Sequence, residues 1–580
     1  MNQKKIKEFA FVFGGYTLLT LILTYPVIFR LSTHFMCDRG DGFQNVWNMW
    51  WIKKTLTELF THPYHTDYLH HPEGTTLLFQ TLNPFNGLIS IPLQFIFKME
   101  VVYNLIVLFS FVMSGVGMYF LVRYLTGHRP AAFISGIIYT FCPYHFAHGL
   151  GHLQLIAMEW IPFYVLYLLK MYHEGELRNA VLTGVFLILT TLCSWYYLIY
   201  CLLLTVIFVA YLLIAHRKEL IESDFLKHLG IALLLFFVCM SPLLGPMAYA
   251  KLTMAFEGQH NPETWSADLT SFVIPSGIST WGRMWFEGIW SQWSGNTAEN
   301  SNYLGYIVFA LSIFAVVRIP GSRFWAIAGA IFWIFALGPY LRVMGKQIQI
   351  PLPYLLLHNY VPLFSFTGVP ERFDVMLKFC MSILAGYAVL ELIQIYFPGI
   401  NDWLNYQHDA EVNPAQAVEK NWQVSGIELV FVAVVGLLIC VEYLALPYTT
   451  TQVNVPQFYR QMANESDKYA VIDVPSNALT LYYATIHQKP IVGGYISRSP
   501  RKALDFLDET PIISTLMRGE PAPPSDQIND ALLQLTEYNI RYIITHNDRH
   551  RAFLEEVLSL PKVYDAEGIK AYRCVVPEQQ

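Results

Sequence analysis

Long apolar runs separated by short polar turns dominate the chain up to about residue 446. An α-helix rises about 1.5 Å per residue, so about 20 mostly apolar residues cross the roughly 30 Å hydrocarbon layer of a membrane. The pattern therefore predicts a polytopic α-helical membrane protein with about eleven transmembrane helices. These helices are expected near residues 8–30, 101–122, 131–147, 153–170, 178–195, 198–215, 227–248, 303–317, 324–341, 372–397 and 426–446.

The apolar run at 84–98 decides the topology. It begins at Pro84, contains Pro92 and is short for a full crossing, so it is predicted to be re-entrant or interfacial. With this choice and a cytoplasmic N-terminus, every short basic turn falls on the cytoplasmic side, as the positive-inside rule requires. The basic residues concerned are Lys4, Lys5 and Lys7, then Arg123, Arg129, Lys170, Arg178, Arg217, Lys218, Lys227, Arg318 and Arg323.

This topology divides the polar segments between the two sides of the membrane. The loops 31–100 and 249–302 and everything after about 447 become extracytoplasmic, whereas 398–425 becomes a long cytoplasmic loop. Residues 1–446 are thus expected to form the transmembrane domain.

After Pro447 the composition changes to that of a soluble domain. Short β-branched or aromatic runs alternate there with helical patterns, which predicts a small extracytoplasmic α/β domain over 447–580. The predicted strands are 469–474, 490–495, 542–545 and 570–575, and the predicted helices are 527–538 and 551–558.

Composition agrees with a lipid environment. Apolar residues make up 54% of the chain and charged residues 14%, well below the roughly 25% of soluble domains. The net charge of −6 provides no general attraction for nucleic acid, which we exclude as a partner. The eight cysteines show no zinc-site spacing, so no cofactor is indicated, although a divalent metal would be compatible with the chain.

An acidic pair, Asp38 and Asp41, opens the first extracytoplasmic loop directly after the first span. At a membrane boundary, burial can bring a carboxylate into the pKa range of a general base. The alternative is a solvated loop followed by an interfacial helix, which Trp47, Trp50 and Trp51 would anchor from one face.

A second group of ionisable residues lies at the external turn between the third and fourth spans. It comprises His145, His148, His152 and Glu159. Ionisable groups near membrane depth are costly and suggest function, here hydrogen bonding to a lipid-linked phosphate. The alternatives are interface histidines satisfied by water and backbone, or a zinc site.

Three further residues are candidates for ligand contacts. Arg372 opens the tenth span on the external side, where its forked donors suit a phosphate or an ion pair with Glu371. The loop 249–302 contains Trp265 and Asp268. A tryptophan there suits a sugar ring, and equally an aromatic belt at the interface.

Four segments of the chain resemble a known group of membrane proteins. They are G-D-G-F-Q-N-V-W-N-M-W-W (40–51), H-P-E-G-T-T-L-L-F-Q-T-L-N-P-F-N-G (71–87), P-Y-H-F-A-H-G-L-G-H-L-Q-L-I-A-M-E-W-I-P (143–162) and G-V-P-E-R-F (368–373). Together with the long acidic first loop and the external C-terminal domain, they resemble the GT-C superfamily of glycosyltransferases, which includes the aminoarabinose and protein O-mannosyl transferases. The resemblance covers most of residues 1–390 and extends to uncharacterised bacterial members.

The resemblance implies an inverting transferase in a bacterial cytoplasmic (inner) membrane, acting in the cell envelope. It would move a sugar from a polyprenyl-phosphate donor to an extracytoplasmic glycan, lipid or protein acceptor. Asp41 would be the catalytic base, with Asp38 as the other candidate because the two aspartates are not adjacent here. Arg372, His145, His148 and His152 would bind the donor phosphate, and Trp265, Asp268 and Glu159 would contact sugar or acceptor.

Two other classes of function fit parts of the pattern. A non-catalytic scaffold or assembly subunit could keep the same architecture and use the C-terminal domain to contact a partner in a membrane complex. A transporter of lipid-linked sugars would be expected to show inverted repeats with broken helices, and the sequence has neither.

Overall fold

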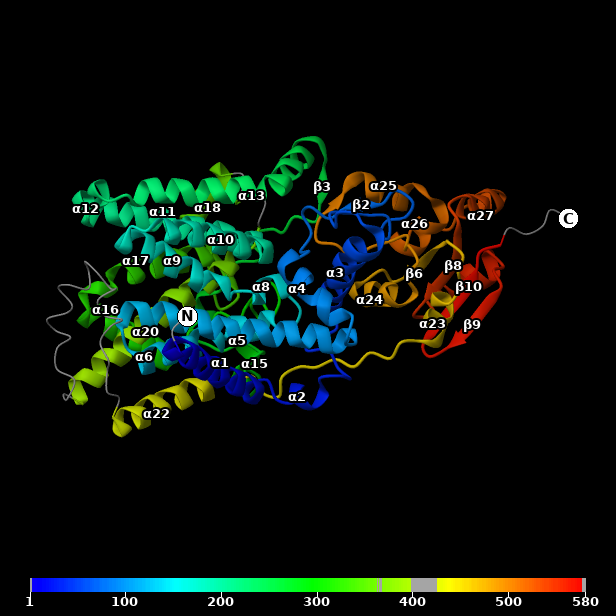
Figure 1. The fold of residues 1–580 in the computed structure, drawn as a ribbon. Coiled ribbons are helices and arrows are strands. Elements are labelled where there is room, and N and C mark those ends of the chain that lie inside the picture. Colours follow the sequence, from blue (N-terminus) through cyan, green and yellow to red (C-terminus); the bar gives the residue numbers. More distant parts are fainter. Residues whose placement is uncertain (1–2, 362–363, 365–367, 398–424, 576–580) are drawn as a thin grey trace. The chain divides into compact units, whose positions relative to one another are not determined.

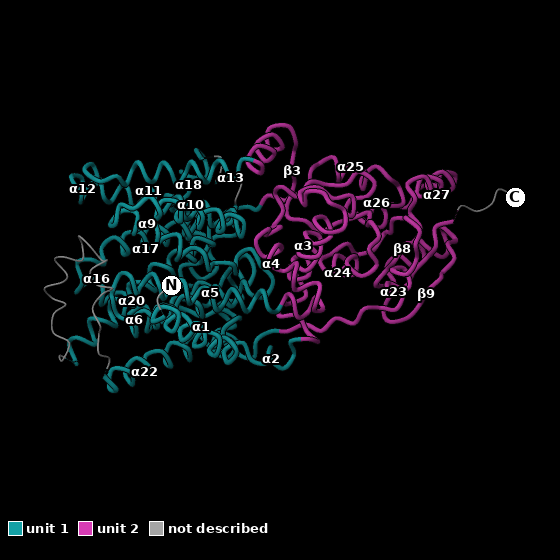
Figure 2. Tube along the Cα trace, viewed as in Figure 1, with its two compact units in different colours: residues 1–31, 104–241, 260–449 teal, residues 32–103, 242–259, 450–580 magenta. Residues whose placement is uncertain are grey.

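The computed structural model describes residues 3–361, 364, 368–397 and 425–575. Within them the chain divides into two compact units, which Figure 2 colours separately. Unit 1 comprises residues 1–31, 104–241 and 260–449, and unit 2 comprises 32–103, 242–259 and 450–580. The predicted cytoplasmic loop 398–425 lies outside the described residues except for its last position.

Unit 1 is helical (Figure 1). Its helices, of which α5 and α13 also extend into unit 2, are α1 (Gln3–Leu23), α2 (Val27–Arg30), α5 (Met99–Thr126), α6 (Arg129–Thr140), α7 (Pro143–His148), α8 (Leu153–Ile156), α9 (Trp160–Glu174), α10 (Leu177–Cys193), α11 (Trp195–Ala215), α12 (Arg217–Glu222), α13 (Phe225–Thr253), α14 (Thr280–Trp285), α15 (Glu287–Trp290), α16 (Tyr306–Arg318), α17 (Arg323–Ala336), α18 (Tyr354–Tyr360), α20 (Asp374–Tyr396) and α22 (Gly426–Glu442). A hairpin of β4 (Tyr340–Val343) and β5 (Lys346–Pro351) is its described sheet.

Six helical segments in the described part of the chain are long and apolar enough to cross a membrane. They are Gln3–Leu23, Met99–Thr126, Leu153–Glu174, Trp195–Ala215, Phe225–Thr253 and Pro370–Tyr396. The chain is thus a helical protein of membrane type. The other five predicted spans contain the shorter helices α6, α10, α16, α17 and α22, so the total of eleven stays a prediction.

Helix α20 is the most deeply buried of these segments and packs against α6, α16 and α17. Its first turn carries a buried ion pair in which Lys378 Nζ lies 2.6 Å from Asp374 Oδ2. The same ammonium donates to the carbonyl of Asn302 at 2.8 Å. This contact fixes the segment before α16 against the beginning of α20. Arg372 lies in the turn directly before α20.

Unit 2 combines the first long loop with the C-terminal residues. Its helices are α3 (Gly42–Lys54), α4 (Pro84–Gln94), α23 (Gln457–Ala463), α24 (Ala478–His487), α25 (Arg501–Glu509), α26 (Pro511–Arg518) and α27 (Ile528–Glu537). A mixed sheet has the order β6 (Ala470–Val474), β8 (Ile540–Thr545), β10 (Ile569–Arg573) and β9 (Lys562–Ala566), with β6 and β8 parallel and the other pairs antiparallel. Two-stranded pairs join β1 (His65–Thr66) to β2 (Thr75–Thr76) and β3 (Phe256–Glu257) to β7 (Ser499–Pro500).

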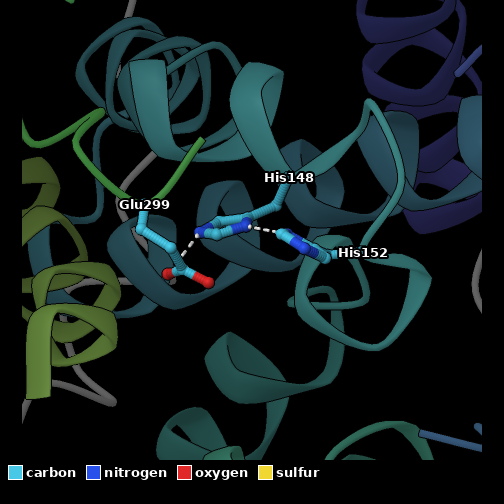
Figure 3. Close-up of side chains that lie close together, drawn as sticks. All are labelled: His148, His152 and Glu299. Atoms are coloured by element: carbon cyan, nitrogen blue, oxygen red, sulfur yellow. Dashed lines mark hydrogen bonds and ion pairs between the residues drawn. The ribbon is translucent and has the colours of Figure 1, made fainter. Parts of the chain in front are cut away.

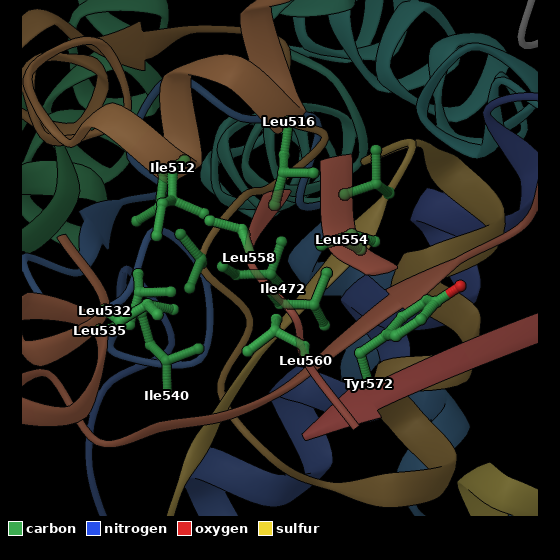
Figure 4. Close-up of a cluster of buried hydrophobic side chains, with 14 of the residues drawn as sticks. Ile472, Ile512, Leu516, Leu532, Leu535, Ile540, Leu554, Leu558, Leu560 and Tyr572 are labelled. Carbon is green, nitrogen blue, oxygen red and sulfur yellow. The ribbon is translucent and has the colours of Figure 1, made fainter. Parts of the chain in front are cut away.

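An apolar core joins this sheet to its helices (Figure 4). Ile472 and Ile543 from the parallel strands, Leu516 from α26 and Leu535 from α27 are buried in it. The strands predicted at 469–474, 542–545 and 570–575 correspond to β6, β8 and β10.

The strand predicted at 490–495 does not form. Residues 490–493 are held by backbone hydrogen bonds to Val471 on one side and to Tyr68, His70 and His71 on the other, with one parallel bridge between Val471 and Ile491. The segment therefore makes backbone hydrogen bonds like those of a sheet on both sides but does not form a regular strand.

The first loop is well packed within unit 2. Helix α4 has 11 residues, which corresponds to about 16 Å and is too short to cross a membrane. The alternative of an interfacial helix anchored by three tryptophans is wrong, because Trp47, Trp50 and Trp51 are at most 8% exposed and pack on one another and on Tyr68. Helix α3 instead packs between α4 and α24.

Candidate functional site

A buried ion pair is the centre of the candidate site in unit 1. Arg372 lies in the short 3-10 turn Pro370–Phe373 that leads into α20, and Glu299 lies in the segment before α16. Arg372 Nε lies 3.0 Å from Glu299 Oε1 and 3.2 Å from Oε2, and Nη2 lies 2.5 Å from Oε1. Nη1 makes no hydrogen bond within the described residues, so a donor is left for a ligand.

Two histidines extend this pair into a row (Figure 3). His148 Nε2 lies 3.8 Å from Glu299 Oε2, and its Nδ1 lies 2.8 Å from Nδ1 of His152. His148 ends α7 and His152 precedes α8, so the turn between these short helices brings both rings to the same place. The structure thus assembles two of the three predicted histidines with Arg372.

Aromatic rings surround the charged groups. The Arg372 guanidinium lies 4.7 Å from the ring centre of Tyr196, and the ring of Tyr144 stands edge-on to His148 at 4.1 Å. A cation over an aromatic face is attracted to its negative potential, which helps to retain the arginine in an apolar setting.

Burial and charge act in opposite directions on this row. Burial raises the pKa of Glu299, but the Arg372 guanidinium outweighs it and holds that pKa at about 2. Burial lowers the pKa of His148 well below its ordinary value, so that the ring is neutral despite the nearby carboxylate. The row is therefore one guanidinium–carboxylate pair with two imidazoles that can donate or accept a hydrogen bond.

The same atoms could ligate a cation. One ligand atom from each of His148, His152 and Glu299 lies within 4.8 Å of the others, and imidazole and carboxylate suit zinc. The guanidinium already neutralises the only carboxylate of this group. The charge balance consequently gives a divalent cation little net attraction.

His145 and Glu159 are buried in the same unit. Both ring nitrogens of His145 face backbone carbonyls, of Thr140 at 2.7 Å and of Ile156 at 2.9 Å. Glu159 accepts a hydrogen bond from Ser110 at 2.7 Å, and its other oxygen has no partner within the described residues. The phosphate role of His145 stays a prediction.

Trp265 and Asp268 belong to the loop that packs beside the Arg372 turn. The carbonyl of Trp265 accepts a hydrogen bond from the Glu371 backbone N–H at 3.2 Å. Oδ1 of Asp268 accepts hydrogen bonds from the N–H and the hydroxyl of Thr270 and from the Met344 N–H, and Oδ2 accepts one from the Gly345 N–H. A sugar contact by Asp268 stays a prediction.

The two loop aspartates belong to unit 2. Asp41 precedes α3 and its Oδ1 accepts a hydrogen bond from the Tyr495 hydroxyl at 2.8 Å. Asp38 is exposed and its Oδ1 accepts the Gly40 N–H at 2.8 Å. Burial, and then the Asp41 charge, raise the pKa of Tyr495, which keeps this phenol protonated and donating. The convergence of Asp41 with Arg372 and a histidine across the two units stays a prediction.

Glu299 and Tyr495 were not predicted from the sequence. Glu299 stands in the polar stretch Asn296–Asn302 directly before a predicted span, whereas Asp38 and Asp41 follow one. Tyr495 is 454 positions from Asp41 and carries no motif that would connect the two.

Comparison with known families decides where the chain belongs. Residues 12–393 match the model of a family described as a domain of unknown function, DUF6311. The chain belongs to this family. No curated protein matches the DUF6311 chain in sequence.

Solved structures with a similar fold are membrane glycosyltransferases of the GT-C type. The archaeal oligosaccharyltransferase AglB from Archaeoglobus fulgidus, in complex with an inhibitory peptide and a dolichol-phosphate, has 13% identity and a TM-score of 0.51 over 99% of this chain and 75% of its own. ArnT from Cupriavidus metallidurans, bound to undecaprenyl phosphate, has 12% identity and a TM-score of 0.51 over 97% of each chain.

The arabinofuranosyltransferase AftD from Mycobacteria has 12% identity and a TM-score of 0.57, with 99% of the DUF6311 chain and 40% of its own length covered. The DUF6311 chain therefore has the GT-C fold, which confirms the resemblance inferred from its motifs. At this identity the likeness establishes the fold alone.

Proposed function

We propose that the protein is an inverting GT-C glycosyltransferase that moves a sugar from a polyprenyl-phosphate donor to an extracytoplasmic acceptor in a bacterial cytoplasmic membrane. The observation that carries the proposal is the buried row of Arg372, Glu299, His148 and His152 in a unit of apolar helices. Ionisable groups in such surroundings are costly and are a functional hypothesis by default.

The row suits the phosphate of a lipid-linked sugar. Arg372 keeps donors that Glu299 does not use. The bond between the two Nδ1 atoms of His148 and His152 uses one N–H, and the ring that accepts it has an Nε2–H to donate to a phosphate. As the bond between sugar and phosphate breaks, negative charge develops on the phosphate oxygens, and fixed donors stabilise that charge. Glu299 positions the guanidinium without contacting the donor.

The other half of the reaction needs a base. Asp41 would accept the acceptor's proton or orient its hydroxyl, with the Tyr495 hydroxyl holding the carboxylate in place. Asp38 is exposed and would contact the acceptor. The relatives bound to dolichol-phosphate and undecaprenyl phosphate support this class of donor, and the identity of sugar and acceptor is left open.

Retention of undecaprenyl phosphate tests the donor half directly. The purified full-length protein is incubated with undecaprenyl phosphate, and the bound fraction is measured by native mass spectrometry. Arg372→Lys keeps the positive charge beside Glu299 and removes the forked donors, so we expect about tenfold weaker retention. Arg318→Lys, at the exposed end of α16, is the matched control and should retain the lipid as the wild type does.

Two results would contradict the donor assignment. One is a wild-type protein that retains no undecaprenyl phosphate above a background set by a neutral polyprenol. The other is equal weakening by Arg372→Lys and Arg318→Lys, because a general effect of arginine replacement would then explain the loss.

A further inference from the structure

Unit 2 contains a cavity that the proposed transfer reaction does not use. It has a volume of about 270 Å³ and is lined within this unit by residues of the C-terminal region and by His70 of the first loop. Val474 ends β6 and is followed by Pro475 and Ser476, whereas Asn547, Arg549 and His550 follow the end of β8. Because β6 and β8 are parallel, these two loops meet at the carboxyl edge of the sheet, where α/β domains bind ligands.

The charged residues that line the cavity are positive. Arg518 and Arg549 line it, and no aspartate or glutamate does so among the described residues. Arg518 forms an ion pair with Asp508, whose Oδ1 lies 2.8 Å from Arg518 Nε. Arg549 forms no ion pair within the described residues, so its guanidinium is available to an anion.

Polar atoms inside the cavity are left without partners. His70 is 2% exposed, and its hydrogen-bonding contact among the described residues is with the backbone of Ala503, which leaves at least one of its two ring nitrogens without a partner there. The hydroxyl of Ser476 is also buried and unpartnered within the described residues. Buried polar groups are nearly always hydrogen-bonded, so these atoms indicate a missing ligand or ordered water.

Two glycines give access to these atoms. A Cβ on Gly493 would lie 2.6 Å from Ser476 Oγ, and a Cβ on Gly494 would lie 2.8 Å from His70 Nε2. Any other residue at either position would crowd the polar atoms that line the cavity. The wall is thus shaped so that a ligand can reach Ser476 and His70.

We propose that this cavity binds a phosphorylated or carboxylated monosaccharide. Its anionic group is held by Arg549 and Arg518, and its hydroxyl groups bond to Ser476 and His70. The volume lies just below the roughly 300–1,000 Å³ of drug-sized pockets, which suits one sugar ring with one acidic group. The site is independent of the transfer reaction and would give the extracytoplasmic part of the chain a ligand of its own.

Titration of the full-length protein in detergent with four probes tests the site. The probes are glucose 6-phosphate, glucuronate, inorganic phosphate and neutral glucose, and binding is measured by isothermal titration calorimetry. We expect saturable binding of glucose 6-phosphate or glucuronate and none of glucose. Inorganic phosphate should bind more weakly than glucose 6-phosphate if the hydroxyl contacts contribute, and preference between the two sugars tells phosphate from carboxylate.

Two variants separate specific binding from general attraction. Arg549→Gln should weaken the bound sugar about tenfold or more, because hydrogen bonds to charged groups are lost. Arg573→Gln removes the same charge from the exposed end of β10 outside the cavity and should change nothing. Ser476→Ala should weaken the sugar and spare inorganic phosphate.

The proposal is overturned if none of the anionic probes binds saturably at millimolar concentration, or if glucose binds as well as they do. Equal weakening by Arg549→Gln and Arg573→Gln would also overturn it. A circular dichroism melt of each variant ensures that loss of binding is read on folded protein.

Discussion

Arg372 and Glu299 form a forked, buried ion pair across 73 positions of sequence. The pair joins the turn before α20 to the segment before α16, and His148 lies against its carboxylate side. A buried guanidinium with donors to spare is an arrangement that can receive a phosphate. Removing either partner of the pair leaves an unpaired buried charge, which lowers the free energy of unfolding.

The first prediction concerns the stability of this pair. Arg372→Gln leaves the Glu299 carboxylate buried without its counterion, which we expect to lower the free energy of unfolding by roughly 3–5 kcal/mol. The double variant Arg372→Gln/Glu299→Gln should recover a large part of that loss, because neither charge is then left alone. Denaturant titration of both variants and of Glu299→Gln gives the coupling energy. Purely additive effects would show that the two residues do not act as a pair.

Asp268 provides the second prediction. Its carboxylate accepts hydrogen bonds from Thr270, Met344 and Gly345, so Asp268→Asn should destabilise the loop and the β4–β5 hairpin by about 1–3 kcal/mol. Undecaprenyl phosphate retention per folded molecule should not change. A normal melting temperature combined with a raised apparent KM for the acceptor would instead assign Asp268 to the sugar or acceptor.

The third prediction is that the His148–His152–Glu299 group works without a bound divalent metal. The guanidinium of Arg372 neutralises Glu299, so the group offers a cation little net attraction. Prolonged EDTA treatment should leave undecaprenyl phosphate retention within twofold of the untreated protein. Loss of retention that stoichiometric Zn²⁺ restores would contradict this prediction and make these residues a metal centre.

The fourth prediction concerns pH and unit 2. Burial disfavours the charged form of His546, but the Asp473 carboxylate, 2.8 Å away, outweighs it and raises the pKa of His546 above its ordinary 6.5. Because the folded pKa is the higher one, this contribution to stability is fully present below about pH 6.5. It is lost as the pH rises through the folded pKa. His546→Gln should therefore destabilise the protein at pH 6 and much less at pH 9.

Thermal melts of wild type and His546→Gln at the two pH values measure this difference. Tyr459 also donates to Asp473 at 2.8 Å, and the ring of Tyr483 stacks on His546 with ring centres 5.9 Å apart. Because these contacts also affect stability, wild type and His546→Gln are compared in the same buffers. A gap between the two proteins that is constant with pH would mean that His546 contributes through packing alone.

The sequence was informative where a regular period or a local motif carried the signal. The apolar runs gave the helical character of the chain, and alternating β-branched runs gave β6, β8 and β10. Short motifs identified His148, His152 and Arg372, which the fold brings together.

Contacts between distant segments were beyond such reasoning. Nothing local to Glu299 marks it as the partner of Arg372, because the pairing arises only when α16 and α20 pack. The alternative interpretation of the first loop placed the three tryptophans of α3 at a lipid interface, yet α4 and α24 cover that helix. Amphipathic periodicity indicates which face of a helix is buried. It does not show whether protein or lipid covers that face.

The most direct test of the central claim is release of polyprenyl phosphate by Asp41→Asn. Wild-type protein and the variant are reconstituted in proteoliposomes with lipid-linked sugars and acceptor extracted from the source membranes, and free polyprenyl phosphate is followed over time. Asp38→Asn is the matched control. We predict that Asp41→Asn folds normally and slows release by about 10²–10⁴-fold, the usual contribution of a general base, whereas Asp38→Asn has a smaller effect. Release by Asp41→Asn at the wild-type rate would contradict the catalytic account and favour a non-catalytic scaffold.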